Sequence, residues 1–314
     1  MKKLSLSIKL LILIIIVSIS YSGAAAGKEV AAQKIAVIVS QSIRPYIEAV
    51  EGLSSEISAE GEGISDVIFL DKFEGKDLVN LSQTLDKKDI DLFIAIGPHA
   101  ARFVWEDIKA VKAARFYSMV LNPEKVLAML EFAAGIPLNI SAKTQVEMIH
   151  RGMPSVNRIG IIYDPEYNLD FFGDAYEEAD LKNIRIVSLA VSSRKDIPLV
   201  LKNNWNDLDA LWLIPDRTVI SESIVQYVIK EALFNGVPVI GYNRFFYESG
   251  AALAFIFDYS EIGRQCAKEA LKLLSEREVK KSEPVFNVWV NERVMNRLGM
   301  ETGSKYHPPV GFGP

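Results

Sequence analysis

The chain is poor in the residues from which catalytic and metal sites are built. Its 314 residues include one cysteine, Cys266, and three histidines that lie far apart in the sequence. A single thiol excludes an intrachain disulfide and a thiolate metal site. No Gly-x-Ser-x-Gly, glycine-rich phosphate loop or His-Glu-x-x-His motif occurs. We therefore expect no enzyme activity, no catalytic residue, no metal site and no cofactor.

The chain also lacks a basic stripe. Its 35 Lys and Arg residues are outnumbered by 40 Asp and Glu residues, and the net charge is −5. Binding to a phosphate backbone requires clustered cationic side chains. Nucleic acid is therefore not expected as a partner.

The first 26 residues have the pattern of a secretory signal peptide. Three lysines precede the apolar run Leu10–Val17, and small residues ending in Ala26 follow it. The run is shorter than the roughly 20 residues of a membrane span, and an uncleaved anchor is the alternative. No cysteine follows the run, so lipoprotein processing is not expected. Cleavage near Ala26 would leave 32 basic and 40 acidic residues, a net charge of −8, in a periplasmic or otherwise exported protein.

Apolar runs of strand length alternate with segments of helical periodicity. Runs bounded by turn residues predict buried parallel strands, and a period of 3.6 residues predicts helices. The strands expected in the first half are Lys34–Ser40, Asp66–Leu70, Asp91–Gly97 and Arg115–Leu121, and the helices are Pro45–Ser58, Lys76–Asp86 and Pro98–Lys109. Repeated strand-helix-strand units predict a parallel sheet with helices on both faces.

The alternation pauses at Ala134–Ser141 and then starts again, which predicts a second α/β half. The strands expected there are Arg158–Tyr163, Arg185–Ala190, Ala210–Pro215, Val237–Gly241 and Val285–Val290, and the helices are Lys143–Arg151, Phe171–Lys182, Ile197–Asn203, Ser221–Phe234 and Asn291–Leu298. Within it, Asp209–Leu274 indicates strand, helix, strand, polar-aromatic turn, strand and helix. The two halves share this pattern without a residue-level repeat.

Five segments resemble, in the right order, the motifs of one family. They are MPSVNRIGIIYDPEYN, IPDRTVISESIV, GVPVIGYNRFFYESGAALAF, FDYSEIGRQCAKEALKLL and VFNVWVNERVMNRLGM. Together they resemble the ABC-transporter substrate-binding proteins of the family that includes tryptophan- and tyrosine-binding members. The similarity extends from about Lys34 to Met300. Its most distinctive piece is Asp-Tyr-x-x-x-Gly-Arg-Gln, which begins at Asp258.

This resemblance implies a type I periplasmic-binding fold, in which two doubly wound parallel-sheet lobes are joined by a three-crossing hinge. The implied crossings lie near Gly135–Ile140, Ala254–Asp258 and Pro284–Val290. The expected division assigns residues 30–137 and 258–285 to the first lobe, residues 138–257 and 286–302 to the second, and residues 303–314 to a flexible tail.

Polar residues follow the predicted strands at their carboxyl ends. In open α/β sheets, ligands bind beyond these ends, where free N–H groups of the following helices favour anions. The expected ligand-binding residues are Ser40, Ser42, Gly97, Pro98, His99 and Asn122 in the first lobe, and Asp164, Asn168, Asp216, Arg217, Thr218 and Asn243 in the second. The resemblance supports Gly97–Ala100, Asp164–Asn168 and Asp216–Thr218 in particular. A ligand touching both sets would stabilise a closed hinge.

Several polar residues have two interpretations. His99 either contacts the ligand or packs at a strand end, and Asp216 either pairs with a ligand amine or caps a turn. Arg217 either neutralises an acidic ligand or is an ordinary exposed loop residue. Asp258 has capping-box spacing and is interpreted as a helix cap. Cys266 lies on an apolar helix face and is interpreted as an inert buried thiol.

The sequence departs from the family near the expected ligand. Gly97-Pro98-His99 stands where Gly-Thr-Pro is common, so a threonine hydroxyl able to bind a carboxylate is missing. Asn122 replaces the acidic residue of a Ser-Asp-Pro type turn, and Asp164-Pro165 replaces Asn-Pro. An amino-acid ligand therefore does not follow from the resemblance.

The expected function is the capture of a small polar solute, either an amino acid or a related anion, by the binding protein of an ABC import system. Its partners would be that small molecule and a membrane permease, and the protein would act as a monomer. One alternative is a ligand-sensing subunit for a membrane receptor kinase. Another is a two-lobed glycosyltransferase-like enzyme, which would need a phosphate loop or an acid-base pair.

Overall fold

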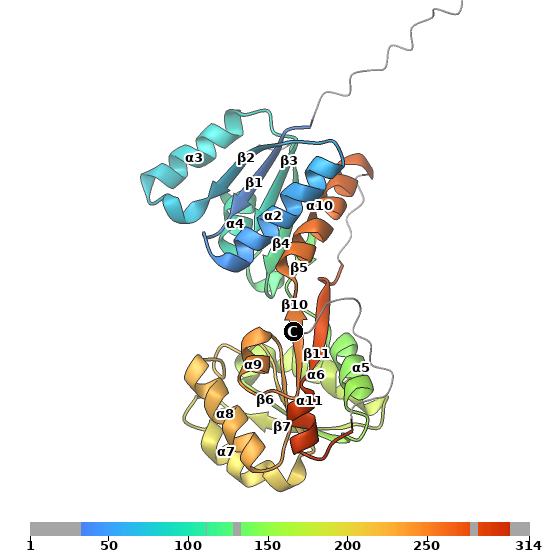
Figure 1. Ribbon diagram of the computed structural model, residues 1–314. Coiled ribbons are helices and arrows are strands. Elements are labelled where there is room, and N and C mark those ends of the chain that lie inside the picture. The colour runs from blue at the N-terminus through green and yellow to red at the C-terminus, as the bar shows by residue number, and fades with distance from the viewer. Residues whose placement is uncertain (1–32, 111, 128–132, 277–281, 302–314) are drawn as a thin grey trace, which may run out of the picture. The chain divides into compact units, whose positions relative to one another are not determined.

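The structure is a computed structural model that describes residues 33–110, 112–127, 133–276 and 282–301, and it contains two α/β lobes (Figure 1). The predicted signal peptide and the predicted flexible tail lie outside the described residues. The elements of the first lobe are β1 (Ile35–Val39), α2 (Arg44–Ala59), β2 (Ile64–Phe69), α3 (Lys76–Lys87), β3 (Leu92–Ile96), α4 (Pro98–Arg102), β4 (Ala114–Val120), β5 (Ala134–Pro137) and α10 (Tyr259–Glu276).

The second lobe repeats this alternation and ends in the further strand β11 and helix α11. Its elements are α5 (Ala142–Gly152), β6 (Arg158–Tyr163), α6 (Pro165–Asp180), β7 (Arg185–Ala190), α7 (Ile197–Asn204), β8 (Ala210–Leu213), α8 (Glu222–Phe234), β9 (Val239–Gly241), α9 (Arg244–Glu248), β10 (Leu253–Phe257), β11 (Phe286–Val290) and α11 (Glu292–Arg297). The predicted strands and helices are present, and most of their ends agree within three residues.

The two sheets have the same strand order. The first sheet is β2-β1-β3-β4-β5, and the second, read from the opposite edge, is β7-β6-β8-β9-β10-β11. All pairings are parallel except β10 with β11, which is antiparallel. This order reverses direction beside the first strand of each lobe, and such a switch point is where doubly wound sheets bind ligands. The predicted doubly wound class is confirmed.

Each lobe receives the helix that follows the fifth strand of the other lobe. After β5 the chain runs through Leu138–Ser141 into α5, whose apolar side packs in the core of the second lobe. After β10, Asp258 leads into α10, which packs against α2 of the first lobe. The chain then returns to β11. These three passages are the crossings of the hinge, whereas the exact lobe boundaries given above stay a prediction.

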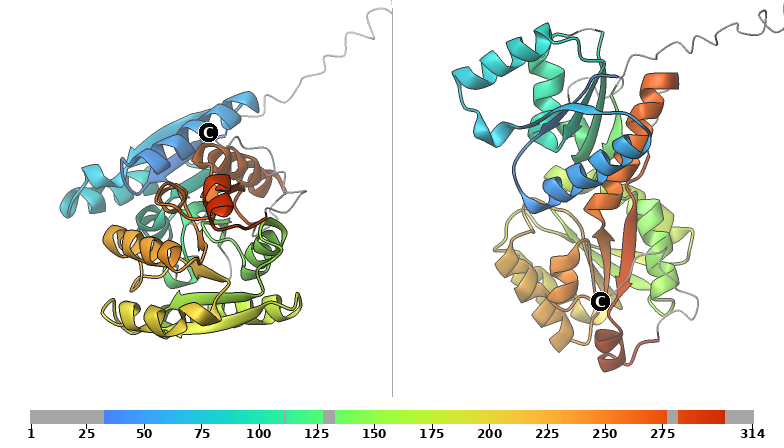
Figure 2. Two further views of the ribbon diagram at one scale, coloured as in Figure 1. Left: turned by 60° about the horizontal axis from the view of Figure 1, so that its bottom comes forward. Right: turned by 45° about the horizontal axis from the view of Figure 1, so that its top comes forward.

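Buried side chains on both faces of each sheet form the two cores. Alternate residues of a strand point to opposite faces. In the first lobe, α2 and α10 therefore cover the face that carries Ile35 and Val37, while α3 and α4 cover the face that carries Ala36 and Ile38. In the second lobe, α5 and α6 lie on one face, and α7 and α8 lie on the other (Figures 1 and 2).

Two glycines allow α2 and α10 to approach closely, and these helices lie side by side in both figures (Figures 1 and 2). A Cβ atom placed on Gly52 would collide with the backbone of Ser260, and one placed on Gly263 would collide with the backbone of Ala49. Backbone atoms cannot rotate away as a side chain can, so this contact requires glycine at both positions.

Four local structures differ from the sequence-based expectation. The pause at Ala134–Ser141 contains the edge strand β5, which is too short to give a periodic signal. Helix α4 ends at Arg102 and continues as a π-helical turn, Phe103–Asp107. The polar-aromatic turn is the short helix α9. Helix α6 begins at Pro165, six residues before the predicted start.

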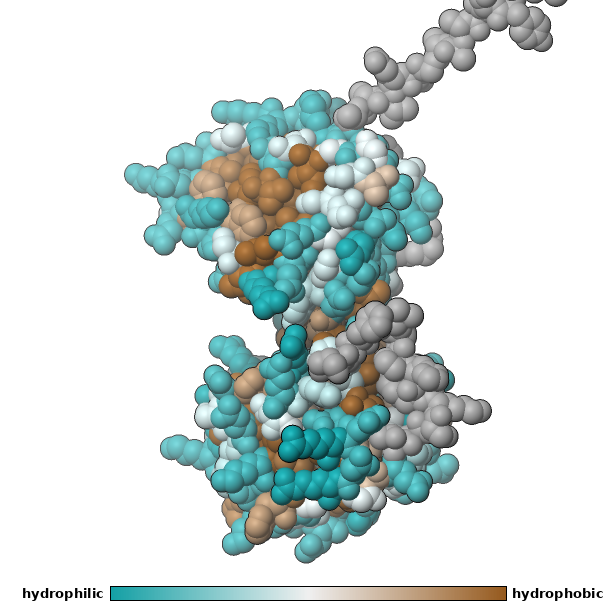
Figure 3. Space-filling model, viewed as in Figure 1, coloured by the Kyte–Doolittle hydropathy of each residue, from teal (hydrophilic) through white to brown (hydrophobic). Residues whose placement is uncertain are grey.

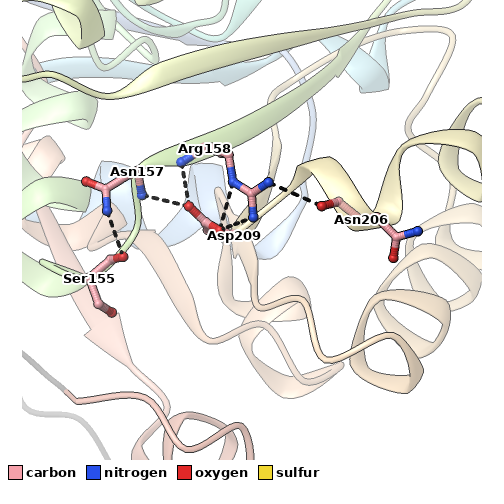
Figure 4. Close-up of polar contacts among 5 residues, drawn as sticks. All are labelled: Ser155, Asn157, Arg158, Asn206 and Asp209. Carbon is pink, nitrogen blue, oxygen red and sulfur yellow. Dashed lines mark hydrogen bonds and ion pairs between the residues drawn. The ribbon is translucent and has the colours of Figure 1, made fainter.

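The amino ends of β6 and β8 are tied together by Asp209 (Figure 4). Its Oδ2 accepts the backbone N–H groups of Asn157 and Arg158, at 3.1 and 2.8 Å, and its Oδ1 accepts Nη2 of Arg158 at 2.7 Å. Burial acts to raise the pKa of the Asp209 carboxyl, but these hydrogen bonds and the Arg158 charge outweigh it and lower the pKa. In the first lobe, Asp91 likewise accepts the backbone N–H of Lys34, at 2.9 Å.

One surface of the first lobe is hydrophobic. In the space-filling view, apolar side chains gather over the strands between α2 and α3 (Figure 3). Exposed residues of these elements include Ile47 on α2, Val67 on β2 and Val79 on α3, which is 55% exposed.

Among the described residues, no helix combines the length and the apolar character that crossing a bilayer requires.

Candidate functional site

A cavity of about 620 Å³ is lined by residues from both lobes. Its lining combines an apolar wall with amide, acidic and basic side chains. The lining residues are Leu121, Asn122, Lys125, Leu138, Asn139, Ile140, Gln145, Tyr167, Asn168, Phe171, Ile214, Pro215, Asp216, Arg217, Ile220, Tyr242 and Phe257. Most of them follow the carboxyl ends of β4, β5, β8, β9 and β10 or lie in the first turns of α6. The size and the mixed lining are those of a small-molecule site.

Asp216 is the centre of the polar side of this cavity. The side chain is 2% exposed, and both oxygens of its carboxylate accept hydrogen bonds. Oδ2 accepts the backbone N–H of Asp164 at 2.8 Å and Nδ2 of Asn168 at 2.7 Å. Oδ1 accepts the backbone N–H groups of Thr218 and Val219, at 2.8 and 3.0 Å. Asp216 therefore has the turn-capping role that was one of its two interpretations.

Asp164 connects the ends of β6 and β8. Its Oδ1 accepts the N–H of Glu166 at 3.0 Å and so caps α6, while its Oδ2 accepts the hydroxyl of Thr218 at 2.7 Å. Pro165 occupies the first helical position, where its missing N–H costs nothing. Because Pro165–Asn168 is polar, periodicity could not reveal this turn, and its signal was the Asp-Pro capping pair.

Asn168 is held in an unusual backbone geometry inside α6. Its φ of −133° and ψ of 24° are not helical, and they kink the helix. Because its Nδ2 donates to an Asp216 oxygen, which can only accept, the orientation of the amide is set. Oδ1 of Asn168 must therefore face away from Asp216.

Asn122 and Lys125 of the first lobe line the cavity together with Asn139, which lies in the crossing after β5. Nδ2 of Asn139 donates to Oδ1 of Asn122 at 2.6 Å, and Oδ1 of Asn139 accepts the N–H of Asn122 at 2.8 Å. Asn122 has a left-handed backbone, with φ of 48°, which asparagine tolerates better than most residues. Lys125 extends to the second lobe, where its Nζ donates to the backbone oxygen of Tyr167 at 2.6 Å.

Aromatic side chains complete the cavity on the second lobe. The Arg217 guanidinium lies 5.9 Å from the ring centroid of Tyr167. The negative charge of the neighbouring Glu166 raises the pKa of the Tyr167 phenol. Burial, and then the charge of Asp216, raise the pKa of Tyr242, so its hydroxyl stays protonated and can both donate and accept.

Four of the predicted ligand-binding residues line the cavity together: Asn122, Asn168, Asp216 and Arg217. Asp164 and Thr218 stand behind Asp216 and support it. Asn243 caps α9, where its Oδ1 accepts the N–H of Phe246 at 3.2 Å. The ligand-binding role of all these residues stays a prediction.

The remaining predicted residues lie at the ends of β1 and β3, outside the cavity lining. Oγ of Ser40 accepts the N–H of Ala100 at 2.9 Å, and Ser42 bonds Asp71 through its N–H at 2.7 Å. Gly97 has φ of 88°, and a Cβ there would lie 2.7 Å from Ser40 Oγ. Pro98 and His99 are exposed at the start of α4. Their contact with a ligand also stays a prediction.

Five polar residues of the lining are absent from the expected ligand-binding residues: Lys125, Asn139, Gln145, Tyr167 and Tyr242. Of these, Tyr167 lies within Asp164–Asn168, a segment that the resemblance supports. Tyr167 and Tyr242 directly neighbour predicted residues, so a wider window at each strand end would have included them. Asn139 follows β5, which was not recognised as a strand. Lys125 and Gln145 carry no signal of their own, because their position depends on how the two lobes meet.

Side chains suited to metal binding do not gather in the described part of the chain, where no group of three His, Cys, Asp or Glu residues could hold an ion. Cys266 is fully buried, and burial raises the pKa of its thiol far above the ordinary value. The predicted burial of Cys266 on an apolar helix face is confirmed. A thiolate is the reactive form of cysteine, and the inertness of this thiol stays a prediction.

Comparison with solved structures identifies the fold. The ligand-free, open structure of a substrate binding protein with adhesive properties from Clostridium difficile matches with a TM-score of 0.69 and 21% identity, over 87% of this chain and 97% of that one. The L-Trp complex of an ABC domain from Streptococcus pneumonia matches with a TM-score of 0.57 and 18% identity, over 86% and 96%. These neighbours have type I periplasmic-binding folds, as the resemblance implied.

Sequence comparison identifies the family. A tyrosine-binding protein of Clostridioides difficile (strain R20291) is 23% identical over 142 residues, which are 45% of this chain and 41% of that protein. The match thus spans about two fifths of the length of that curated relative. The profile of the family described as ABC transporter substrate binding protein matches residues 34–303, nearly all of the described chain. The chain therefore belongs to the ABC transporter substrate binding protein family.

Proposed function

We propose that this chain is the exported solute-binding protein of an ABC import system, and that it holds a small organic solute in the cavity between its lobes. The observation that carries the proposal is that cavity, which combines residues of both lobes. Its apolar wall suits a hydrocarbon or aromatic body, and its polar side suits a head group that is an amino acid or a related anion. The tyrosine-binding relative and the L-Trp complex support a solute of this kind.

The two lobes and their three crossings suggest hinge closure as the binding mechanism. A ligand that contacts Asn122 on the first lobe and Asn168 on the second obtains both contacts only in one arrangement of the lobes. The ligand therefore shifts the population of lobe arrangements toward that one. The size of the shift is set by the difference in ligand affinity between the arrangements. We propose a membrane permease as the partner that receives the solute, with the binding protein acting as a monomer. The family is one of solute-binding proteins, and we assign no catalytic residue.

Export belongs to the same proposal. We expect the mature protein to begin near Gly27, after removal of the signal peptide. Intact-mass measurement of the protein from the expressing cell's exported fraction tests this, with the expected loss of residues 1–26. A full-length protein found only in the membrane fraction would favour the uncleaved anchor.

A thermal-shift screen tests the binding function directly. The purified protein is screened with amino acids, organic acids, nucleosides and sugars at concentrations up to the millimolar range. A true ligand present at about 100 times its Kd stabilises the protein by about 2.7 kcal/mol, which shifts the midpoint by several degrees. Absence of any stabilising solute, together with detectable turnover of a test substrate, would refute the proposal.

A further inference from the structure

Two cations line the cavity without a carboxylate partner among the described residues. Lys125 Nζ donates to a backbone oxygen, that of Tyr167, and Arg217 lies over the Tyr167 ring. Within the described ranges, neither Lys125 nor Arg217 forms an ion pair. Both side chains are exposed, one on each lobe. Their positive charges are therefore available to a ligand.

The acidic side of the cavity is, by contrast, already occupied. Among the described residues that line it, Asp216 is the only carboxylate. A carboxylate offers about four lone-pair sites, and Asp216 accepts four hydrogen bonds from the protein itself. Asp164, behind it, is also engaged at both oxygens. Among the described lining residues, a ligand ammonium would therefore find no free carboxylate. Burying a cation without such a partner is costly.

The rest of the wall favours an apolar body. Leu138, Ile140, Phe171, Ile214 and Phe257 line the cavity and offer a carbon surface to the ligand. The cavity thus combines two cations that are available to a ligand, a carboxylate whose acceptor sites are filled by the protein, and a hydrophobic wall.

We propose that the ligand is an amphipathic organic acid, with a carboxylate on an aromatic or branched apolar body and without an ammonium group. This inference rests on the proposed solute-binding function and narrows its substrate class. The carboxylate lies between Lys125 and Arg217, and the apolar body lies against the wall. An amino acid of the same body carries an ammonium that the cavity leaves unpaired, so it binds more weakly.

Three ligand series with matched bodies test the head group by titration calorimetry. The phenyl series is 3-phenylpropanoate, phenylalanine and 2-phenylethylamine. The indole series is 3-indolepropanoate, tryptophan and tryptamine, and the branched series is 4-methylpentanoate, leucine and 3-methylbutylamine. In the best-binding series the acid is expected to bind at least about tenfold more tightly than the zwitterion. A hydrogen bond to a charged group accounts for a difference in affinity of about this size.

The outcomes separate this inference from the proposed function. Tighter binding of a zwitterion or an amine overturns the organic-acid inference and leaves solute binding intact. Absence of binding in all three series also overturns it, whereas the solute-binding proposal fails only if the wider solute screen is empty too.

Charge variants locate the head group. Lys125→Met and Arg217→Met are each expected to weaken binding of the acid about tenfold and to narrow its advantage over the zwitterion. Arg185→Met is the matched control, because Arg185 is exposed at the start of β7 and does not line the cavity. An unchanged affinity in both cavity variants, or an equal loss in the control, overturns the placement.

Discussion

At the scale of single residues, the acidic side chains at the strand ends of the second lobe form hydrogen bonds within the protein, and these bonds hold the backbone of the site. Asp216 was expected either to bind a ligand amine or to cap a turn, and its four accepted hydrogen bonds assign it the second role. Asp164 caps α6 and binds Thr218. These two acids hold the backbone in place, so that Asn168 and Arg217 are presented to the cavity.

Asp216→Ala should therefore destabilise the unliganded protein. The substitution leaves four donors without their acceptor, and buried N–H groups without partners are costly, so we expect a loss of about 3 kcal/mol. Asp258→Ala is the comparison, because Asp258 is an exposed helix cap that accepts the N–H of Glu261 at 3.0 Å. Its loss should cost about 1 kcal/mol. Urea unfolding measures both, and equal stability of Asp216→Ala and the wild type would contradict the supporting role.

At the scale of elements, the close packing of α2 against α10 depends on the absence of two Cβ atoms. Gly263→Ala places a methyl group against the backbone of Ala49, so the helices must separate. We expect a loss of about 2 kcal/mol or more in the free energy of unfolding.

Gly173→Ala is the matched control for this prediction. Gly173 lies within α6, and a Cβ there would meet no atom within 4 Å. Alanine should raise the stability there by up to about 1 kcal/mol, because it favours a helix over the unfolded chain. Thermal unfolding of the two variants should therefore move in opposite directions. Similar effects of both would mean that the helix contact is not tight.

The Asp209 contact makes the second lobe sensitive to acid. Its folded-state pKa is lowered below the ordinary value of 3.8, so the carboxylate stabilises the fold above that pH. This contribution is lost as the pH falls through the folded-state pKa. Asp209→Asn should cost about 1 to 2 kcal/mol at pH 7, and the difference from wild type should shrink below pH 3.8.

Asp89→Asn serves as the control for charge alone. Asp89 is 96% exposed and lies 3.7 Å from Lys34. Exposed pairs contribute little, so the change should stay within about 0.5 kcal/mol at every pH. The test is urea unfolding of both variants between pH 3 and pH 7. A difference for Asp209→Asn that is independent of pH would show that its carboxylate charge is not responsible.

The same element scale explains which parts of the fold could be predicted. Strands β1 and β3 are continuous apolar runs bounded by polar residues, and the long helices are amphipathic, so periodicity located them. The kink at Asn168 and the edge strand β5 depend on contacts with distant residues, and no local pattern marks them. The contact of Lys34 with Asp91 is similar to the contact of Arg158 with Asp209, and both lie at equivalent strand starts. The sequence alone does not reveal this similarity.

At the scale of the whole molecule, binding is expected to change the distribution of lobe arrangements. Small-angle X-ray scattering of the protein with a ligand from the thermal-shift screen should give a smaller radius of gyration than the protein alone. The physical reason is that a ligand in the proposed site would contact residues of both lobes and would stabilise the arrangement that offers both sets of contacts. A radius of gyration that is unchanged at saturation would contradict hinge closure while leaving binding itself established.

The sequence by itself determined the α/β class, the two halves, most strands and helices, and the family. Burial of apolar residues imposes continuous apolar runs or a period of two residues on strands, and a period of 3.6 residues on helices. The family followed from five motifs that occur in the right order. Only the tertiary structure decided which polar residues meet. The chain brought Asn122, Asn168, Asp216 and Arg217 into one cavity, added Lys125 from a segment without a pattern, and left Ser40 and His99 outside. The physical reason is that a shared cavity depends on the packing of distant segments and on hydrogen-bond saturation, which local sequence does not encode.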